Sequence, residues 1–362
     1  MSNQWLIYGV TGYTGQLIIE EAKKQGLSLT MAGRSESKLA AMKEQYGYDY
    51  LCFDLDSRQE IAEILKDYKV LLNCAGPFSK TAKVMISACL HSNTHYLDIT
   101  GEVAVFEHAR MLHKTATQKN VLLCPGVGFD VVPTDCLAKG VHERLPDAET
   151  LWLGFDSLSR MSPGTAKTAV EGLASGGKVC RGGRVVDVPL AYKVRNIDFG
   201  NGTKSAATIP WGDVSTATVG TDIPNVEVYV PVPEKKIKSL RRMEKFRWFF
   251  KFNWVIKMMQ NRIDKKVVGP NEERRAKNAT YVWAEGINRA GDVVTGRIKT
   301  LNGYDVTKDA AIAISQYLLH NEVAPGFITP GTLMGSDFVE KLPGSEKIIW
   351  EDTRSESTDA LE

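Results

Sequence analysis

The sequence predicts an α/β fold in which a doubly wound parallel sheet is joined to a second, mixed α+β domain. Short apolar runs alternate with helical patterns over the first third of the chain, as in repeated strand and helix units. Beyond about residue 148, runs such as "RVVDVPLAYKVRNIDFG" and "VEVYVPVP" alternate apolar and polar residues, as in strands with one covered face. We expect the first domain over residues 1–147, the second over 148–303, a C-terminal helix returning to the first domain over 304–345, and a mobile tail over 346–362.

The elements of the first domain follow one another in a regular order. Six strand candidates are "QWLIYGV", "LSLTMAG", "YDYLCFDL", "KVLLNCAG", "HYLDIT" and "VLLCPGVG", with helical patterns near 14–25, 36–45, 57–67, 79–91 and 103–118. Right-handed crossovers between such units give a parallel sheet whose ligand crevice lies beyond the carboxyl ends of its strands. The residues at those ends are therefore the candidates for a site.

The stretch "YGVTGYTGQL" follows the first strand and places glycines at positions 9, 12 and 15. Glycine lets the backbone approach a phosphate closely, and the helix N-terminus that follows supplies amide donors. The spacing departs from the common G-x-G-x-x-G pattern because Thr11 stands where a second glycine would be. The stretch predicts the pyrophosphate site of a Rossmann-type dinucleotide-binding domain, with an ordinary glycine-rich turn as the alternative.

The end of the second strand indicates which dinucleotide is bound. The chain continues as Gly33-Arg34-Ser35 with no acid at the strand end, and an arginine with a neighbouring hydroxyl suits a 2′-phosphate. The sequence therefore favours NADP. Glu36 leaves NAD open, although an acid is also favourable in the first turn of the following helix.

Four further strand ends carry polar or small residues. They are Asp54 after the third strand, Ala75, Gly76, Pro77 and Phe78 after the fourth, Asp98 after the fifth and Asp130 after the sixth. Each also fits ordinary loop chemistry, such as helix capping or a turn. Together they face one crevice, where small residues would admit a ribose of the cofactor and Phe78 would pack against its rings.

Composition excludes several classes of protein. The 362 residues carry a net charge of +2. The six cysteines form no C-x-x-C pair and the six histidines no H-E-x-x-H motif, so we expect no metal site and reduced thiols. The first residues contain no basic leader, which predicts a cytoplasmic protein. No nucleic-acid-binding motif is present, so we expect no nucleic-acid partner.

The positive charge is concentrated in residues 235–266, which hold twelve Lys and Arg against two acidic residues. Within this segment, "KFRWFFKFNWVIKMM" (245–259) is rich in aromatic residues but too short and too charged to span a bilayer. Either it is an apolar plug against the second domain or a dimer partner, or it makes peripheral contact with a membrane or covers an acyl-chain pocket.

Eight motifs occur along the chain in this order: "GVTGYTG", "AGRSESKL", "NCAGPF", "YLDITGE", "GFDVVPTD", "SPGTAKT", "GPNEERR" and "LNGYDVT". In these motifs the chain resembles the saccharopine dehydrogenase-like oxidoreductases, including the trans-acting enoyl reductase branch. The resemblance covers nearly the whole chain to about residue 340. It implies a nicotinamide-binding Rossmann domain, a mixed second domain that often forms homodimers, Arg34 at the adenosine end and 75–78 beside the cofactor. It implies that the phosphates lie against Gly9, Thr11, Gly12, Tyr13, Thr14 and Gly15.

The chemistry is less specified than the cofactor. No Tyr-x-x-x-Lys pair follows the fourth or fifth strand, so a proton must come from another group. Asp98 and Asp130 are the candidates, with Asp135 behind them, although each also fits a structural role. We expect NADP-dependent hydride transfer to an apolar substrate, such as a lipid or an enoyl or keto acyl group. The alternatives are a soluble amino-acid-type (saccharopine-like) dehydrogenase and a non-catalytic nucleotide-binding protein.

Overall fold

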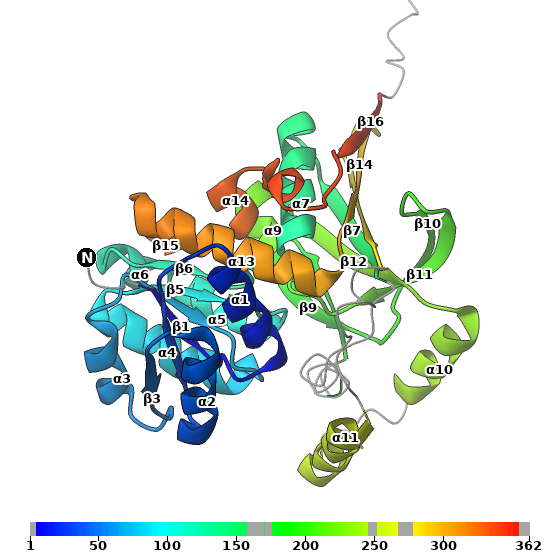
Figure 1. Cartoon of the computed structure of the whole chain (residues 1–362). Coiled ribbons are helices and arrows are strands. Elements are labelled where there is room, and N and C mark those ends of the chain that lie inside the picture. The colour runs from blue at the N-terminus through cyan, green and yellow to red at the C-terminus, as the bar shows by residue number, and fades with distance from the viewer. Residues whose placement is uncertain (1–4, 158–169, 171–175, 245–251, 267–277, 355–362) are drawn as a thin grey trace, which may run out of the picture.

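The computed structural model describes residues 5–157, 170, 176–244, 252–266 and 278–354. It contains two sheets, one of seven strands and one of nine, each covered by helices (Figure 1). The N-terminal sheet is parallel and the second is mixed, so the predicted fold class is confirmed. The motifs at 162–168 and 269–275 and residues 245–251 of the aromatic segment lie outside the described residues.

The first sheet has the order β15-β6-β5-β4-β1-β2-β3, and every pairing in it is parallel. Its strands are almost continuously apolar and buried because helices cover both faces of the sheet. β1 lies between β2 and β4, where the strand order reverses and ligands bind in such sheets. The strands are β1 (Trp5–Tyr8), β2 (Thr30–Gly33), β3 (Tyr50–Cys52), β4 (Val70–Asn73), β5 (His95–Asp98), β6 (Leu122–Cys124) and β15 (Gly326–Phe327).

The helices of this domain lie where the sequence patterns place them, except that the pattern at 103–118 forms two helices. They separate at Leu112, whose φ of −90° and ψ of 3° are not helical. A late helix, α13 (Gly303–His320), packs against α1 and β4. Asn302 is its N-cap residue, and the Asn302 side chain accepts from the Tyr304 and Asp305 amides. The others are α1 (Tyr13–Lys24), α2 (Glu36–Tyr46), α3 (Arg58–Leu65), α4 (Phe78–Ser92), α5 (Val103–Met111) and α6 (His113–Gln118).

The second sheet has the order β10-β11-β12-β7-β13-β14-β16, with β8 pairing with β12 and β9. Its pairings are antiparallel except that of β7 with β12, which is parallel. The strands are β7 (Thr150–Ser157), β8 (Gly177–Arg181), β9 (Arg184–Val188), β10 (Val194–Asp198), β11 (Thr203–Ile209), β12 (Asn225–Pro231), β13 (Thr280–Ile287), β14 (Val293–Thr300) and β16 (Ile349–Thr353).

One face of the second sheet is covered by α7 (Val132–Arg144), against β7, β13 and β14, and by α9 (Asp213–Thr221), against β12. The cover of this sheet is thus built partly from a helix that precedes residue 147. Two helices with many basic residues, α10 (Glu234–Glu244) and α11 (Asn253–Lys266), extend away from the body of the protein (Figure 1). The short α14 (Pro330–Met334) packs on α7, and a 3-10 turn (Phe338–Lys341) follows it.

The expectation of a mobile tail from residue 346 is wrong for its first part, because β16 pairs with β14. The reason is the side chain of Trp350. A Cβ added at Gly140 or Gly296 would lie 2.5 Å from its ring, so the indole fits closely against both glycines. The Arg144 guanidinium lies 4.3 Å from the ring centroid. These contacts bury part of the indole and anchor the strand.

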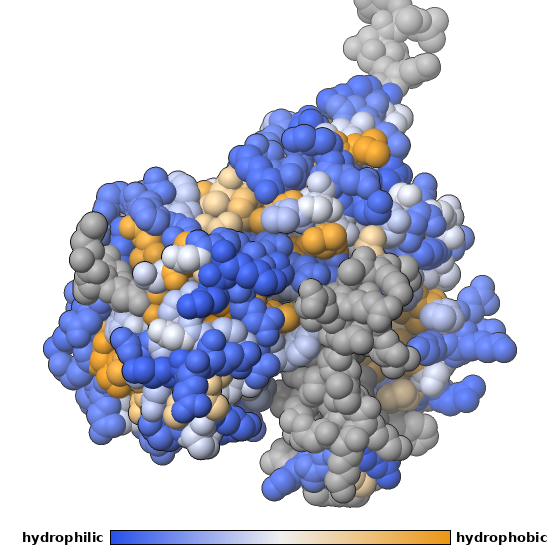
Figure 2. Space-filling view, viewed as in Figure 1, coloured by the Kyte–Doolittle hydropathy of each residue, from blue (hydrophilic) through white to orange (hydrophobic). Residues whose placement is uncertain are grey.

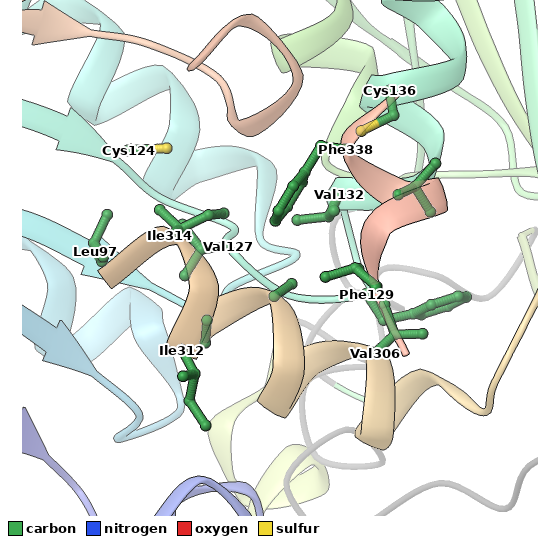
Figure 3. Close-up of a cluster of buried hydrophobic side chains, with 14 of the residues drawn as sticks. Leu97, Cys124, Val127, Phe129, Val132, Cys136, Val306, Ile312, Ile314 and Phe338 are labelled. Atoms are coloured by element: carbon green, nitrogen blue, oxygen red, sulfur yellow. The ribbon is translucent and has the colours of Figure 1, made fainter. Parts of the chain in front are cut away.

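A continuous core joins the two domains. One buried cluster includes residues of the first sheet, such as Leu97, together with Val228 and Val282 of the second. Figure 3 shows its centre, where α13 and the segment from Val127 to Cys136 meet. No helix in the described part of the chain is long and apolar enough to cross a membrane.

Candidate functional site

The turn after β1 requires glycine at two positions for close backbone approach. Gly9 has a φ of +86°, and a Cβ there would lie 2.7 Å from the backbone nitrogen of Ala75. A Cβ at Gly15 would lie 2.6 Å from the Gly9 carbonyl oxygen, so α1 starts closely against the turn. Gly12 differs from both, because a Cβ there would meet only that oxygen, at 3.3 Å, and the residue is exposed.

The start of α1 has the features of an anion site. Gly12 is its N-cap residue, no side chain caps the first turn, and no acid lies in that turn. Thr11, Tyr13 and Thr14 are half-buried around it, and the Tyr13 ring packs edge-on against Tyr304 of α13 at 5.0 Å. The helix amides and dipole therefore favour a negatively charged group beside Gly12.

The strand ends on the β2–β3 side bring three predicted residues together. Arg34 is exposed and pairs with no acid that the structure describes. Ser35 is the N-cap residue of α2, but its side chain makes no capping hydrogen bond. Burial raises the pKa of Tyr8 to about 12, and the charges of Arg34, which lowers it, and Asp54, which raises it, act as smaller causes. Both charged groups therefore lie near the Tyr8 hydroxyl. Asp54 also accepts from the Asp56 amide at 3.0 Å.

Residues 75–78 form a fixed corner after β4. The buried Asn73 accepts from the Ala75 amide at 3.0 Å, and Thr81 donates to the Ala75 carbonyl at 2.7 Å. The α4 N-terminus beside Phe78 is occupied by Glu102, which accepts from the amides of Phe78 and Ser79 at 2.9 and 2.7 Å. Unlike α1, this helix therefore offers no anion site. Gly76 is exposed, and Ala75, Pro77 and Phe78 are half-buried.

Asp98 is fully buried, and both of its carboxyl oxygens have partners. Tyr96 donates its hydroxyl to Oδ2 at 2.7 Å, and the Thr100 and Gly126 amides donate to Oδ1 at 3.0 and 2.9 Å. Burial raises the pKa of Asp98 to about 6, against the lowering effect of these bonds. The geometry is that of a residue that joins the loops after β5 and β6. A catalytic role for Asp98 remains an untested prediction.

Asp130 has a different environment. It is half-buried and has no hydrogen-bond donor among the residues that the structure describes. A Cβ added at Gly101 would lie 2.7 Å from its Oδ2, so the carboxyl lies against the loop after β5, at the carboxyl edge of the sheet. Burial raises the pKa of Asp130 to about 7. A carboxyl of this kind can hold and release a proton near neutral pH.

Two polar residues near this edge were missed by the sequence reasoning. Glu102 closes the α4 N-terminus as described above, which the proximity of "TGE" to a strand end did not indicate. Asp213, the first residue of α9, is fully buried with neither carboxyl oxygen partnered. Nothing in "PWGDVS" distinguishes that aspartate from an ordinary helix N-terminal acid, and only the tertiary structure places it near Asp130.

Metal-binding groups are absent from the described residues: no set of three His, Cys, Asp or Glu side chains is placed to hold an ion. All six cysteines are free thiols.

Comparison with known proteins adds a family to this geometry. Residues 5–124 match the family model of the saccharopine dehydrogenase NADP binding domain. A saccharopine dehydrogenase-like oxidoreductase of Mus musculus is 25% identical over 201 residues, which cover 48% of this chain and 47% of the relative. A lipid droplet localized protein of Caenorhabditis elegans is 27% identical, covering 47% and 44%. A trans-acting enoyl reductase of Mycobacterium ulcerans is 24% identical, covering 40% and 37%.

The chain thus spans about half the length, or less, of these curated relatives. Among solved structures, apo saccharopine dehydrogenase (L-Glu forming) from Saccharomyces cerevisiae superposes with a TM-score of 0.64 over 96% of this chain and 99% of the other. At 10% sequence identity, that likeness shows a shared fold alone.

The described residues fit the cofactor that the family model names. The Gly9–Gly15 turn leaves the α1 amides uncapped beside an exposed glycine, and Arg34 lies free at the neighbouring strand end. These are the features that a pyrophosphate and a 2′-phosphate require. Residues 5–124 thus match the NADP binding domain of the saccharopine dehydrogenase family both in sequence and in the features that hold the cofactor phosphates.

Proposed function

We propose that the protein is an NADP-dependent oxidoreductase that reduces an apolar substrate, such as a lipid or an enoyl or keto acyl group. The observation that carries the proposal is the Asp130 carboxyl, which lies at the carboxyl edge of the parallel sheet with no hydrogen-bond donor in the described part of the chain. That edge is where a dinucleotide lies in this fold.

The first domain would hold the cofactor through three groups of residues. The α1 amides beside Gly12 would bind the pyrophosphate, Arg34 and Ser35 the 2′-phosphate, and the corner at 75–78 would orient the nicotinamide half. When bound, the cofactor supplies the hydride. The role of Asp54 would be to order the loop beside the adenosine, since its carboxylate already accepts from the Asp56 amide.

Asp130 would supply the proton that accompanies hydride transfer. With a pKa raised by burial to about 7, the carboxyl is largely protonated just below neutral pH and can give its proton to a developing anion. The Gly101 backbone lies close enough to fix its position. Asp98 would hold in place the loops after β5 and β6, which lie around Asp130.

An apolar substrate is supported by the aromatic side chains next to Asp130. Phe129 contacts Phe155 at 5.3 Å between ring centroids, and Phe155 contacts Trp211 at 4.9 Å. This chain of rings runs from the sheet edge into the second domain. Two relatives, a trans-acting enoyl reductase and a lipid droplet localized protein, carry names connected with acyl groups or lipid.

Peripheral lipid contact through residues 235–266 belongs to the same proposal. Helix α10 is held by its apolar side, where Ile237 packs with Ala191 and Ala207. Its opposite side is exposed, and hydrophilic residues project there from the body of the protein (Figure 2). Phe252, just before α11, and Met258 within it are 46% and 42% exposed. Basic residues beside exposed apolar ones suit an anionic lipid surface. A homodimer contact is the alternative for this surface, and light scattering of the purified protein would detect it.

Two other functions compete with this one. A soluble amino-acid-type dehydrogenase would need basic side chains for substrate carboxylates, and a non-catalytic nucleotide-binding protein would need no proton donor. NADPH oxidation with a panel of enoyl, keto and imino compounds separates the three. Turnover of enoyl or keto compounds supports the proposal, turnover of imino acids the first competitor, and NADPH binding without any turnover the second.

Asp130→Asn tests the proton donor once a substrate is found. We expect turnover to fall by about 10² to 10⁴, the usual contribution of general acid catalysis, while NADPH affinity is kept. Because Asp98 holds the loops, Asp98→Asn should lower turnover and the thermal midpoint together. An unchanged rate in Asp130→Asn would assign the proton to another group.

A further inference from the structure

The N-terminal turn of α9 contains buried polar atoms for which the structure has no partner. Neither carboxyl oxygen of Asp213 accepts a hydrogen bond, although the residue is 0% exposed. The Trp211 indole nitrogen and the Thr216 hydroxyl, within three residues of Asp213, are also buried and unpartnered. Buried polar groups nearly always have a partner, so three unsatisfied side chains between Trp211 and Thr216 indicate a missing polar ligand.

Asp213 does not have the usual role of an acid at a helix start. The α9 N-cap is Gly212, and no side chain caps the helix. The Thr134 hydroxyl lies near enough to lower the pKa of Asp213, but it donates its proton to the Val131 carbonyl oxygen at 3.0 Å. The carboxyl is therefore neither a cap nor part of a complete hydrogen-bond network.

The turn lies at the boundary between the domains. A Cβ at Gly212 would lie 2.6 Å from the ring of Phe106 in α5, and Ser215 donates to Glu107 of the same helix. The second side of the turn packs on α7. The ring chain of Phe129, Phe155 and Trp211 connects the residue before Asp130 with the residue two before Asp213.

The charges around Asp213 are negative. Asp130 and Asp135 both act on it electrostatically, and no cation that the structure describes does so. Asp135 already has a hydrogen-bond partner, because it accepts from the Gly331 amide at 2.6 Å. Lys139 also lies near Asp135. Glu107, on the α5 side, is paired with Arg110 at 3.0 Å. A buried carboxyl beside two others keeps its proton, and burial accordingly raises the pKa of Asp213 well above its usual value.

Resting on the function proposed above, we infer that Asp213 and Asp130 form a carboxyl pair that binds an uncharged, oxygen-bearing group of the substrate and excludes a carboxylate. The Asp213 O–H and the Trp211 N–H would donate to a ketone, ester or thioester carbonyl, while Asp130 remains available for proton transfer. A substrate carboxylate would lose its hydration at this buried site, would meet no described cation, and would be repelled by Asp130 once that carboxyl is ionised. The pair thus selects the chemical class of the substrate at its reacting end.

The first test needs no substrate and is independent of activity. Infrared spectra of protein with ¹³C-labelled aspartate, taken with NADP⁺ bound, report protonated carboxyl groups. We expect Asp130→Asn to remove a carboxylic acid band that titrates near 7. We expect Asp213→Asn to remove a band that persists above the pH at which the Asp130 band is lost. If Asp213→Asn removes no such band, Asp213 is ionised and the inference is wrong, whatever the enzyme turns out to reduce.

The second test uses two matched probes, 2-octanone and octanoate, in saturation-transfer and titration measurements with NADP⁺ present. We expect the ketone to bind and octanoate not to bind. Asp213→Val should weaken ketone binding by about threefold to tenfold, the contribution of one buried hydrogen bond. Asp213→Asn, which keeps a donor, should weaken it less, and this variant and the infrared band carry the test if Asp213→Val does not fold. Equal binding of octanoate, or full ketone affinity in Asp213→Val, would overturn the inference. Binding without turnover would refute only the proposed reaction.

Discussion

Replacing Asp130 by asparagine should change how the stability of the protein depends on pH. In the folded protein, burial raises the pKa of this carboxyl from 3.8 to about 7, while in the unfolded chain it stays near 3.8. Between these values the folded state binds more protons than the unfolded state. The free energy of unfolding therefore falls as pH rises from about 4 to about 7, and then levels off.

The size of the effect follows from the shift. A difference of about 3 pKa units corresponds to about 4 kcal/mol of destabilisation once the folded carboxyl is ionised. At pH 5 only about 1.5 kcal/mol of this is present, because the folded carboxyl still holds its proton. An asparagine amide at this site has its own desolvation cost, but that cost does not vary with pH. The difference in stability between variant and wild type should therefore shift by about 2 to 3 kcal/mol in favour of the variant between pH 5 and pH 8.

Urea denaturation of both proteins at pH 5, 6, 7 and 8, followed by tryptophan fluorescence and circular dichroism, measures this shift. Asp98→Asn is the matched control, because one of the two accepting oxygens becomes an amide nitrogen, so either the bond from Tyr96 or those from Thr100 and Gly126 are lost. That variant should be less stable than wild type at pH 5 and at pH 8. A difference between wild type and Asp130→Asn that stays constant from pH 5 to pH 8 would show that Asp130 titrates like an exposed carboxyl, and would refute its assignment as a proton donor.

Three further predictions concern cofactor and lipid. Gly12→Val should keep the fold, since a Cβ there meets only one backbone oxygen at 3.3 Å, but it should abolish the NADPH binding that calorimetry measures. Gly15→Val should instead lower the thermal midpoint, because a Cβ there would lie 2.6 Å from the Gly9 carbonyl oxygen. Arg34→Ala should remove a preference for NADPH over NADH, at a cost of about 1.5 to 3 kcal/mol for a charged hydrogen bond, and equal affinities in wild type would contradict the assignment. Binding to anionic vesicles, measured in a sedimentation assay, should weaken as salt is added. It should also weaken when Trp248 and Phe249 are replaced by serine and when charges on the exposed side of α10 are reversed. No binding at low salt would favour a plug or dimer contact. The residues to reverse are Lys235, Lys236, Lys238 and Arg242, because Arg241 donates to the Ala191 carbonyl oxygen.

The first domain was predictable because each of its features is local in the sequence. An apolar run, a glycine turn and a helix pattern follow one another at Trp5 to Lys24, and the structure places a strand, a turn and a helix there. The strand ends could be read in the same way, and Arg34 and Asp130 both lie at the predicted edge of the sheet.

What escaped prediction depends on contacts between distant residues. β16 forms because Trp350 fits against Gly140 and Gly296, and no periodicity near residue 350 reveals those partners. Asp213 and Asp130 are far apart in sequence and come near each other only because α9 packs on α7. The difference between Asp98 and Asp130 has the same origin, since both follow strands and only the folded loops decide which carboxyl has donors.

The return of the chain to the first sheet has a practical consequence for anyone who cuts this protein into pieces. β15 completes one edge of that sheet, and α13 covers α1, although both come from beyond residue 300. A fragment ending near residue 147 would lose that cover and expose buried apolar side chains of α1. It would also separate α7 from the strands it packs on. A minimal nucleotide-binding fragment should therefore splice the segment that carries α13 and β15 onto the N-terminal segment, because neither half of the chain is a folding unit by itself.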